Sequence, residues 1–138
     1  MERFIQQLLE QYPDDLNYVI KHFPLPNHKF ADEGAMAALA AGKQGKFWAF
    51  HSQLLENHKQ VNEEKLLEIA GKLELDMDRF NLDRTSDENR RIIGEDVANG
   101  RQVGVRGTPT VFLNGKRIKN PGALPELIRQ ELEKKGNQ

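Results

Sequence analysis

The sequence predicts a single α/β domain that is rich in helix and has few strands. Apolar residues recur at helical spacing over most of its 138 residues. Two short stretches, residues 16–23 and 110–118, have instead the β-branched and aromatic composition of strands. A long helical stretch separates them, and this order suggests a sheet that is covered by helices.

The composition narrows the classes of function. Twenty Lys and Arg residues oppose twenty-one Asp and Glu residues without blocks of like charge, so nothing indicates nucleic acid or an anionic membrane as a partner. No apolar run approaches the roughly 20 residues of a membrane span, and no signal-peptide core follows Met1. Cysteine is absent, which excludes disulfides, thiolate metal sites and a cysteine nucleophile within this chain.

The N-terminal part predicts one helix and one strand. A helix is expected over residues 2–12, and Pro13 ends it. Its apolar face consists of Phe4, Ile5, Leu8, Leu9 and Tyr12. In the strand at residues 16–23, apolar side chains point to both faces, so we expect it to be covered on both sides.

The middle of the chain, from about residue 29 to residue 100, is expected to be helical. An alanine-rich helix over 30–41 can pack closely against its neighbours and is broken at 42–45. Further helices are expected over 47–57, after Asn62, over 76–82, and from a capping box that begins at Thr85. The last of these should bury Ile92, Ile93 and Val97 before it ends near Gly100.

The C-terminal part predicts a hairpin and a final helix. Residues 110–113 form the expected first strand, and residues 116–118 return as the second. Asn114-Gly115 fits a type I′ turn because both residues tolerate positive φ. Pro109 has no N–H to give to a ladder, which suits the start of a strand.

After the hairpin, residues 123–134 have the apolar spacing of a helix. We see no second domain. Residues 1–26 and 101–138 are expected to form one part of the domain, and residues 27–100 a helical insertion.

Four stretches together resemble the DsbA-like thioredoxin family, the disulfide oxidoreductases with a helical insertion. They are Tyr18 to Pro26 (YVIKHFPLP), Gln44 to Trp48 with His51, Leu75 to Phe80, and Gly104 to Gly115 (GVRGTPTVFLNG). The resemblance spans nearly the whole chain. It implies an α/β thioredoxin-like fold with an α-helical insertion.

The chemistry of this family comes from a Cys-x-x-Cys pair at the N-terminus of the first core helix. The partial positive charge of a helix N-terminus stabilises a thiolate, which attacks a substrate disulfide. In this chain the pair should lie at or just before Met1, and it is missing together with the strand that should precede the helix. The resemblance therefore implies a catalytically incomplete chain and a sheet without its central N-terminal strand.

Two explanations account for the missing residues: a truncated oxidoreductase and a natural cysteine-free relative. We favour truncation, because a gene that had lost only its cysteines would have kept the strand. The gap leaves two ladders of backbone groups unpaired. We expect the remaining strands to pair directly, or a strand to be borrowed in a strand-exchanged homodimer, or the chain to be poorly soluble.

The resemblance places a substrate site at Arg106, Gly107, Thr108 and Pro109. The proline is cis in the family, and the preceding residue, here Thr108, offers its backbone to an extended or unfolded polypeptide. Alternatively, Gly107 and Pro109 only shape the sheet and Arg106 is a solvated side chain.

The histidines and the tryptophan suggest no metal site or cofactor. The histidines are His22, His28, His51 and His58. His51 and His58 are seven residues apart, whereas zinc needs closer partners and a third ligand. Trp48, with its aromatic neighbours, is expected in the core, and presentation of a hydrophobic peptide surface is the alternative.

Three functions follow from the resemblance. The chain is part of a protein thiol–disulfide oxidoreductase, a family usually found in the bacterial periplasm or cell envelope. Alternatively, it is a redox-inactive module that binds peptides or pairs with another subunit. A glutathione-using isomerase on the same fold is the third reading.

Overall fold

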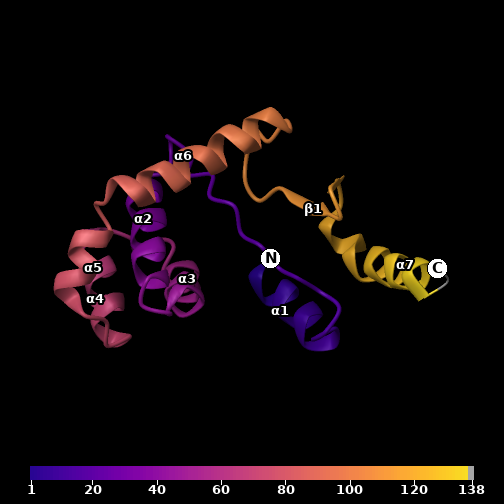
Figure 1. Ribbon diagram of the computed structural model, residues 1–138, viewed down its shortest axis with the longest axis horizontal. Coiled ribbons are helices and arrows are strands. Elements are labelled where there is room, and N and C mark those ends of the chain that lie inside the picture. Colours follow the sequence, from indigo (N-terminus) through magenta and orange to yellow (C-terminus); the bar gives the residue numbers. More distant parts are fainter. Residues whose placement is uncertain (137–138) are drawn as a thin grey trace. The chain divides into compact units, whose positions relative to one another are not determined.

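The computed structural model describes residues 1–136 and divides into two compact units. One unit, here called the terminal unit, consists of Met1–Ile20 and Thr108–Gln138. The other, the helical unit, is Lys21–Gly107. Figure 1 shows the elements of both units along the chain.

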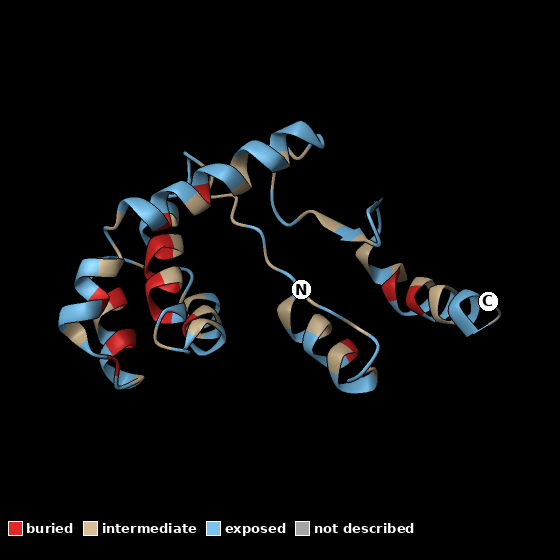
Figure 2. Ribbon diagram, in the orientation of Figure 1, coloured by how far each residue is buried: buried red, intermediate tan, exposed pale blue. Residues whose placement is uncertain are grey.

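The helical unit is built around its first helix. Its helices are α2 (Ala31–Gly42), α3 (Phe47–Glu56), α4 (Glu63–Lys72), α5 (Met77–Asp83) and α6 (Asp87–Gln102). Helix α2 packs against all four others. Close approach is possible because Ala37, Ala40 and Ala41 are completely buried and carry only a methyl group. Within this unit, Figure 2 shows the buried residues on α2 and on the helices that pack against it.

Aromatic and aliphatic side chains from three helices fill the core of this unit. Phe50 of α3 and Phe80 of α5 are fully buried, and their ring centroids lie 5.7 Å apart. Leu66 and Ile69 of α4 belong to the same cluster. Burying side chains of this size contributes about 1.5–3 kcal/mol each.

Polar side chains fix where three of these helices begin. Asn62 accepts a hydrogen bond from Lys65 N, and Asp76 accepts one from Arg79 N. The cap of α6 is Ser86, not Thr85 as expected: Ser86 Oγ accepts from Asn89 N. The Thr85 hydroxyl instead lies within hydrogen-bonding distance of carbonyl oxygens in α5, so it belongs to the end of the preceding helix.

The terminal unit combines two helices with a hairpin. Its elements are α1 (Glu2–Gln11), β1 (Val111–Leu113), β2 (Lys116–Ile118), the 3-10 turn η1 (Pro121–Ala123) and α7 (Leu124–Gly136). Leu8, Leu124 and Ile128 form its buried cluster, against which one face of the hairpin packs.

The hairpin has the expected turn. Val111 pairs with Ile118 and Leu113 with Lys116. Asn114 and Gly115 both have positive φ, 48° and 80°, as a type I′ turn requires.

The strand expected over residues 16–23 does not form: this segment is irregular, and β1 has β2 as its only strand partner among residues 1–136. The expected cover on both sides is also wrong, since Val19 is 61% exposed. The expected direct pairing of this segment with β1 therefore does not form, and its backbone groups do not find hydrogen-bond partners in that strand. Instead the N–H of His22 donates to Asp96 Oδ2 over 2.9 Å.

Apolar alternation makes a segment suitable for a strand, but a ladder also needs a neighbouring strand.

Within the part of the chain that the structure describes, no helix has both the length and the apolar character that crossing a membrane demands.

Candidate functional site

The four predicted site residues form an accessible bend before β1. Arg106, Thr108 and Pro109 are exposed and Gly107 is half-buried. The Thr108–Pro109 peptide bond is cis. The boundary between the two units falls between Gly107 and Thr108, so we describe Thr108 and Pro109 with the terminal unit.

The register of the hairpin defines an outer edge of β1 directly after this bend. In a two-residue hairpin, the residues that flank the turn exchange hydrogen bonds, and pairs of this kind alternate with pairs that do not. Val111 and Leu113 therefore bond to β2, and the N–H and C=O of Phe112 point to the opposite edge. Phe112 is 40% exposed. An extended chain can approach both its backbone and its ring.

Sequence reasoning missed Phe112 as a site residue, although a signal was present. The Asn114-Gly115 turn fixes the register, and the register alone decides which residue of the strand turns its backbone outward.

A second group of residues, in the helical unit, joins aromatic rings with two imidazoles. Phe47 stacks on His51 at 5.7 Å between ring centroids, and Trp48 lies edge-on to Phe47 at 5.1 Å. His22 meets the edge of Phe47 at 6.0 Å. The expectation that Trp48 is a core residue is wrong, because this residue is 46% exposed. Its i+2 neighbour Phe50 occupies the core instead.

The surroundings of His22 favour its neutral form. Burial lowers the pKa of His22, and the nearby His51 acts in the same direction, while the Asp96 carboxylate opposes the shift. Asp96 also lies 3.6 Å from Lys21 Nζ, so part of its charge is compensated. A neutral imidazole is therefore the state expected near neutral pH.

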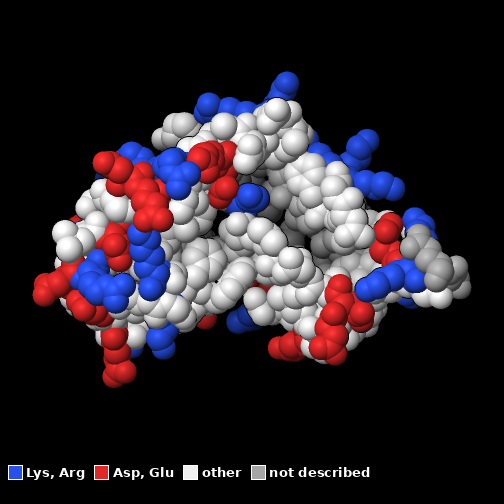
Figure 3. All heavy atoms as spheres, viewed as in Figure 1, with Lys and Arg blue, Asp and Glu red and all other residues white. Residues whose placement is uncertain are grey.

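Whether the histidines could hold a metal ion depends on the number of acidic or imidazole side chains that meet at one place. Within residues 1–136, no three His, Cys, Asp or Glu side chains come together as metal ligands would. His58 Nδ1 lies 3.0 Å from Leu55 O at the end of α3. On the face in view, acidic and basic side chains are interspersed (Figure 3).

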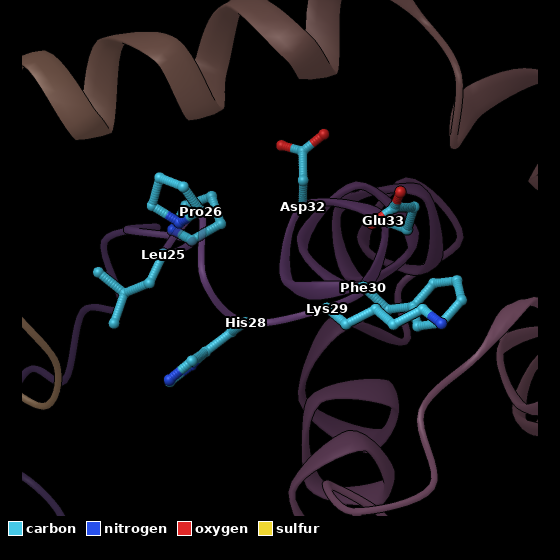
Figure 4. Close-up of a pocket in the computed structure, with 8 residues that line it drawn as sticks. Leu25, Pro26, His28, Lys29, Phe30, Asp32 and Glu33 are labelled. Atoms are coloured by element: carbon cyan, nitrogen blue, oxygen red, sulfur yellow. The ribbon is translucent and has the colours of Figure 1, made fainter.

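A hollow of about 410 Å³ lies at the start of α2, and sequence reasoning did not point to it. Figure 4 shows its lining, which consists of Pro24, Leu25, Pro26, His28, Lys29, Phe30, Asp32 and Glu33. The charged side chains here are exposed and of both signs. Lys29 Nζ lies over the Phe30 ring, 5.3 Å from its centroid. The hollow therefore presents no set of groups that converges on one ligand.

The chain is similar to known proteins over most of its length. The family model described as Thioredoxin matches residues 1–130. A crystal structure of a thioredoxin-like oxidoreductase from Silicibacter pomeroyi DSS-3 superposes with a TM-score of 0.81. It is 25% identical, and the match covers 96% of this chain and 77% of that one.

Curated relatives match the chain with only a part of their own length. The Na(+)/H(+) antiporter NhaA 3 of Salinispora tropica is 37% identical over 87% of this chain, and the antiporter NhaA of Herminiimonas arsenicoxydans is 33% identical over 81%. The match covers 18% of each antiporter. The chain thus spans less than a fifth of the length of these relatives.

Proposed function

Because the chain belongs to the thioredoxin family, we propose that it is the polypeptide-binding part of a DsbA-like thiol–disulfide oxidoreductase. The outer edge of β1 carries this proposal. It begins next to the accessible bend at Thr108 and Pro109, and it offers a donor and an acceptor at Phe112.

An extended polypeptide binds such an edge by adding a strand to the sheet. Its backbone pairs with the N–H and C=O of Phe112, so recognition is largely independent of the substrate sequence. The exposed Phe112 ring adds apolar contact with alternate side chains of the substrate. This combination suits a protein that receives many different unfolded substrates.

The chain itself supplies no thiol, since it contains no cysteine. In thiol–disulfide exchange a thiolate attacks one sulfur of a disulfide, a mixed disulfide forms, and the other sulfur leaves as a thiolate. In the proposed function, this chain holds the polypeptide and the attacking thiolate comes from another source.

The test is binding of a fluorescein-labelled, reduced and carboxymethylated polypeptide, followed by anisotropy. We expect Phe112→Pro to weaken binding about fivefold, because it removes a backbone donor that contributes about 1 kcal/mol. Thr108→Pro should also weaken binding, since Thr108 offers its backbone beside the same edge.

Two controls separate the edge from other effects. Arg117→Pro changes the residue opposite Phe112 on β2 and should leave affinity within about twofold, since it leaves the outer edge of β1 intact. Phe112→Ala removes the ring and keeps the backbone donor. No measurable affinity of the unaltered chain, or equal losses in Phe112→Pro and Arg117→Pro, would refute the proposal.

A second candidate function is that of a subunit-pairing module, and the relatives favour it. In the two antiporters, the part similar to this chain is a small share of a larger protein. The same β1 edge could then pair with a strand from a second copy, as in a strand-exchanged homodimer. Light scattering distinguishes the two: a dimer that Phe112→Pro converts to a monomer supports pairing, and a monomer that binds polypeptide supports the first proposal.

A further inference from the structure

The C-terminal end of α6 leads into the bend at residues 106–109, and the ring of Phe23 lies against this helix end. A methyl group on the Cα of Gly100 would lie 2.9 Å from Cδ2 and Cε2 of Phe23, and 3.6 Å from Cβ of Val105. Only glycine allows the ring to approach α6 this closely. A methyl group at Gly94 of the same helix would meet open space.

The segment that carries Phe23 is attached to the same face of α6 at a second point. The N–H of His22 donates to Asp96 Oδ2 over 2.9 Å, and Lys21 Nζ lies 3.6 Å from Asp96 Oδ1. Asp96 and Gly100 are four residues apart, so they lie on one face of the helix, one turn apart. Residues 21–23 are therefore held against the last two turns of α6.

The end of α6 has the hydrogen bonds of a Schellman motif. The N–H of Val105 donates to Gly100 O over 2.8 Å, and that of Gly104 to Arg101 O over 3.1 Å. Gly104 has the left-handed conformation that the motif needs, with φ of 86°. An apolar contact between the side chains at the positions of Gly100 and Val105 usually completes the motif. Gly100 has no side chain, so the Phe23 ring supplies the apolar surface there.

The direction in which the chain leaves this motif affects how the bend presents its backbone. Only Arg106 and Gly107 separate Val105 from Thr108. Because a peptide unit is planar, the N–H of Thr108 lies in one plane with the C=O of Gly107. A shift of Val105 therefore changes the orientation of the N–H that Thr108 offers to a polypeptide in the proposed function.

We propose that Phe23 and Gly100 are positioning residues of the polypeptide-binding bend. They hold Val105 at the end of α6 and thereby restrict the peptide unit that carries the Thr108 N–H. A backbone group that is already held in place loses less freedom when a ligand binds. The inference rests on the proposed function and adds to it two residues that do not touch the polypeptide.

The test makes one substitution at two glycines of α6. Gly100→Ala places a methyl group against the Phe23 ring, which has to move. We expect it to weaken binding of the fluorescein-labelled, reduced and carboxymethylated polypeptide about fivefold, the factor for one lost hydrogen bond. Gly94→Ala adds the same methyl group in open space and should leave affinity within about twofold while it favours the helix.

Hydrogen exchange separates positioning from a general loss of stability. In Gly100→Ala, the amides of Gly104 and Val105 should exchange about tenfold faster, because their acceptors lie at the altered helix end. The amide of Leu66, a residue of the core of the same unit, should keep its rate.

A second substitution tests whether Gly100 acts through Phe23. Phe23→Leu replaces the ring by a smaller and more flexible side chain, so it leaves space for the methyl group of Gly100→Ala. The double variant should therefore bind more tightly than Gly100→Ala. Phe23→Leu by itself introduces no clash and should weaken binding about twofold. If Gly100→Ala does not fold, this variant decides, and an unchanged affinity would overturn the inference.

The outcomes distinguish this inference from the proposed function. If the unaltered chain binds polypeptide and Gly100→Ala binds as tightly as Gly94→Ala, the inference is wrong and the proposed function stands. Equal acceleration of exchange at Leu66 and Val105 would also overturn it, because the substitution would then act on the whole helical unit. If the unaltered chain does not bind polypeptide, the proposed function is refuted and the inference with it.

Discussion

The ionisation of His22 is linked to folding of the helical unit. Its backbone N–H is bonded to Asp96, and its ring lies against Phe47. Three charged or titratable groups surround it: Asp96 of α6, His51 of α3, and Lys21, which is paired with Asp96. Burial outweighs the attraction of Asp96, so the pKa of His22 in the folded chain is lower than its ordinary value of 6.5.

The sign of the resulting pH dependence follows from this shift. Between the lowered pKa and 6.5 the unfolded chain binds more protons at His22 than the folded chain does. The contribution of His22 to stability is therefore complete above pH 6.5 and falls as the pH drops through this interval.

We predict that His22→Gln removes this part of the pH dependence. Urea unfolding at a series of pH values should show the midpoint of the unaltered chain falling more steeply below pH 6.5 than that of the variant. An NMR titration of the His22 ring gives an independent control. A titration midpoint at or above 6.5 would contradict the account.

The position at which a helix begins is the feature of an element that local sequence determines most directly. Ser86 and Thr85 are adjacent hydroxyl residues, and either could cap α6 in a reading of the sequence. The structure gives the cap to Ser86, whose Oγ accepts from Asn89 N over 3.2 Å.

We predict that Ser86→Ala lowers the free energy of unfolding by about 1 kcal/mol, because the first turn of α6 loses its acceptor. Thr85→Ala should lower the free energy of unfolding by a smaller amount, since the Thr85 hydroxyl lies near carbonyl oxygens of α5 and does not cap α6. Chemical denaturation of both variants provides the measurement. A larger loss of unfolding free energy for Thr85→Ala than for Ser86→Ala would show that Thr85, not Ser86, caps α6.

The same contrast explains which elements the sequence could predict. Helices α2, α3 and α5 begin and end within one residue of the expected positions, and α4 begins directly after Asn62 as expected, because apolar spacing and caps act within a few residues. The hairpin was predictable from Asn114-Gly115 for the same reason.

The absence of a strand at residues 16–23 could not be predicted, because strand formation depends on a partner elsewhere in the chain. The exposure of Trp48 escaped prediction for a related reason. Phe47, Trp48 and Phe50 are all apolar, and only the packing of α3 decides that Phe50 is buried and Trp48 is not.

At the scale of the whole molecule, the chain has the expected thioredoxin-like, helix-rich fold with a small sheet. Its two units have apolar cores of different size. Among the described residues, ten form the buried cluster of the helical unit and three that of the terminal unit. Since burial of apolar surface is the main stabilising contribution, the terminal unit should open more readily.

We predict that native-state hydrogen exchange reports this difference. Backbone amides of α2 and α4 should be the most protected, and those of Val111 and Leu113 in the hairpin should exchange much faster. Leu66 on α4, which is completely buried, gives the reference rate. Equal protection of Leu66 and Val111 would show that the two units open together.

The Asn114-Gly115 turn, which sets the register of the hairpin, is also a site at which the protein can be chemically altered. The N–H of a glycine can attack the side-chain amide of a preceding asparagine, because no side chain hinders its approach; ammonia is lost, and hydrolysis leaves aspartate or isoaspartate. Asn114 is exposed, and its Nδ2 donates to Glu131 over 3.4 Å. Deamidation would place a second carboxylate against Glu131 and, as isoaspartate, lengthen the backbone within the turn. During storage at alkaline pH, deamidation should therefore alter the hairpin before the helices change.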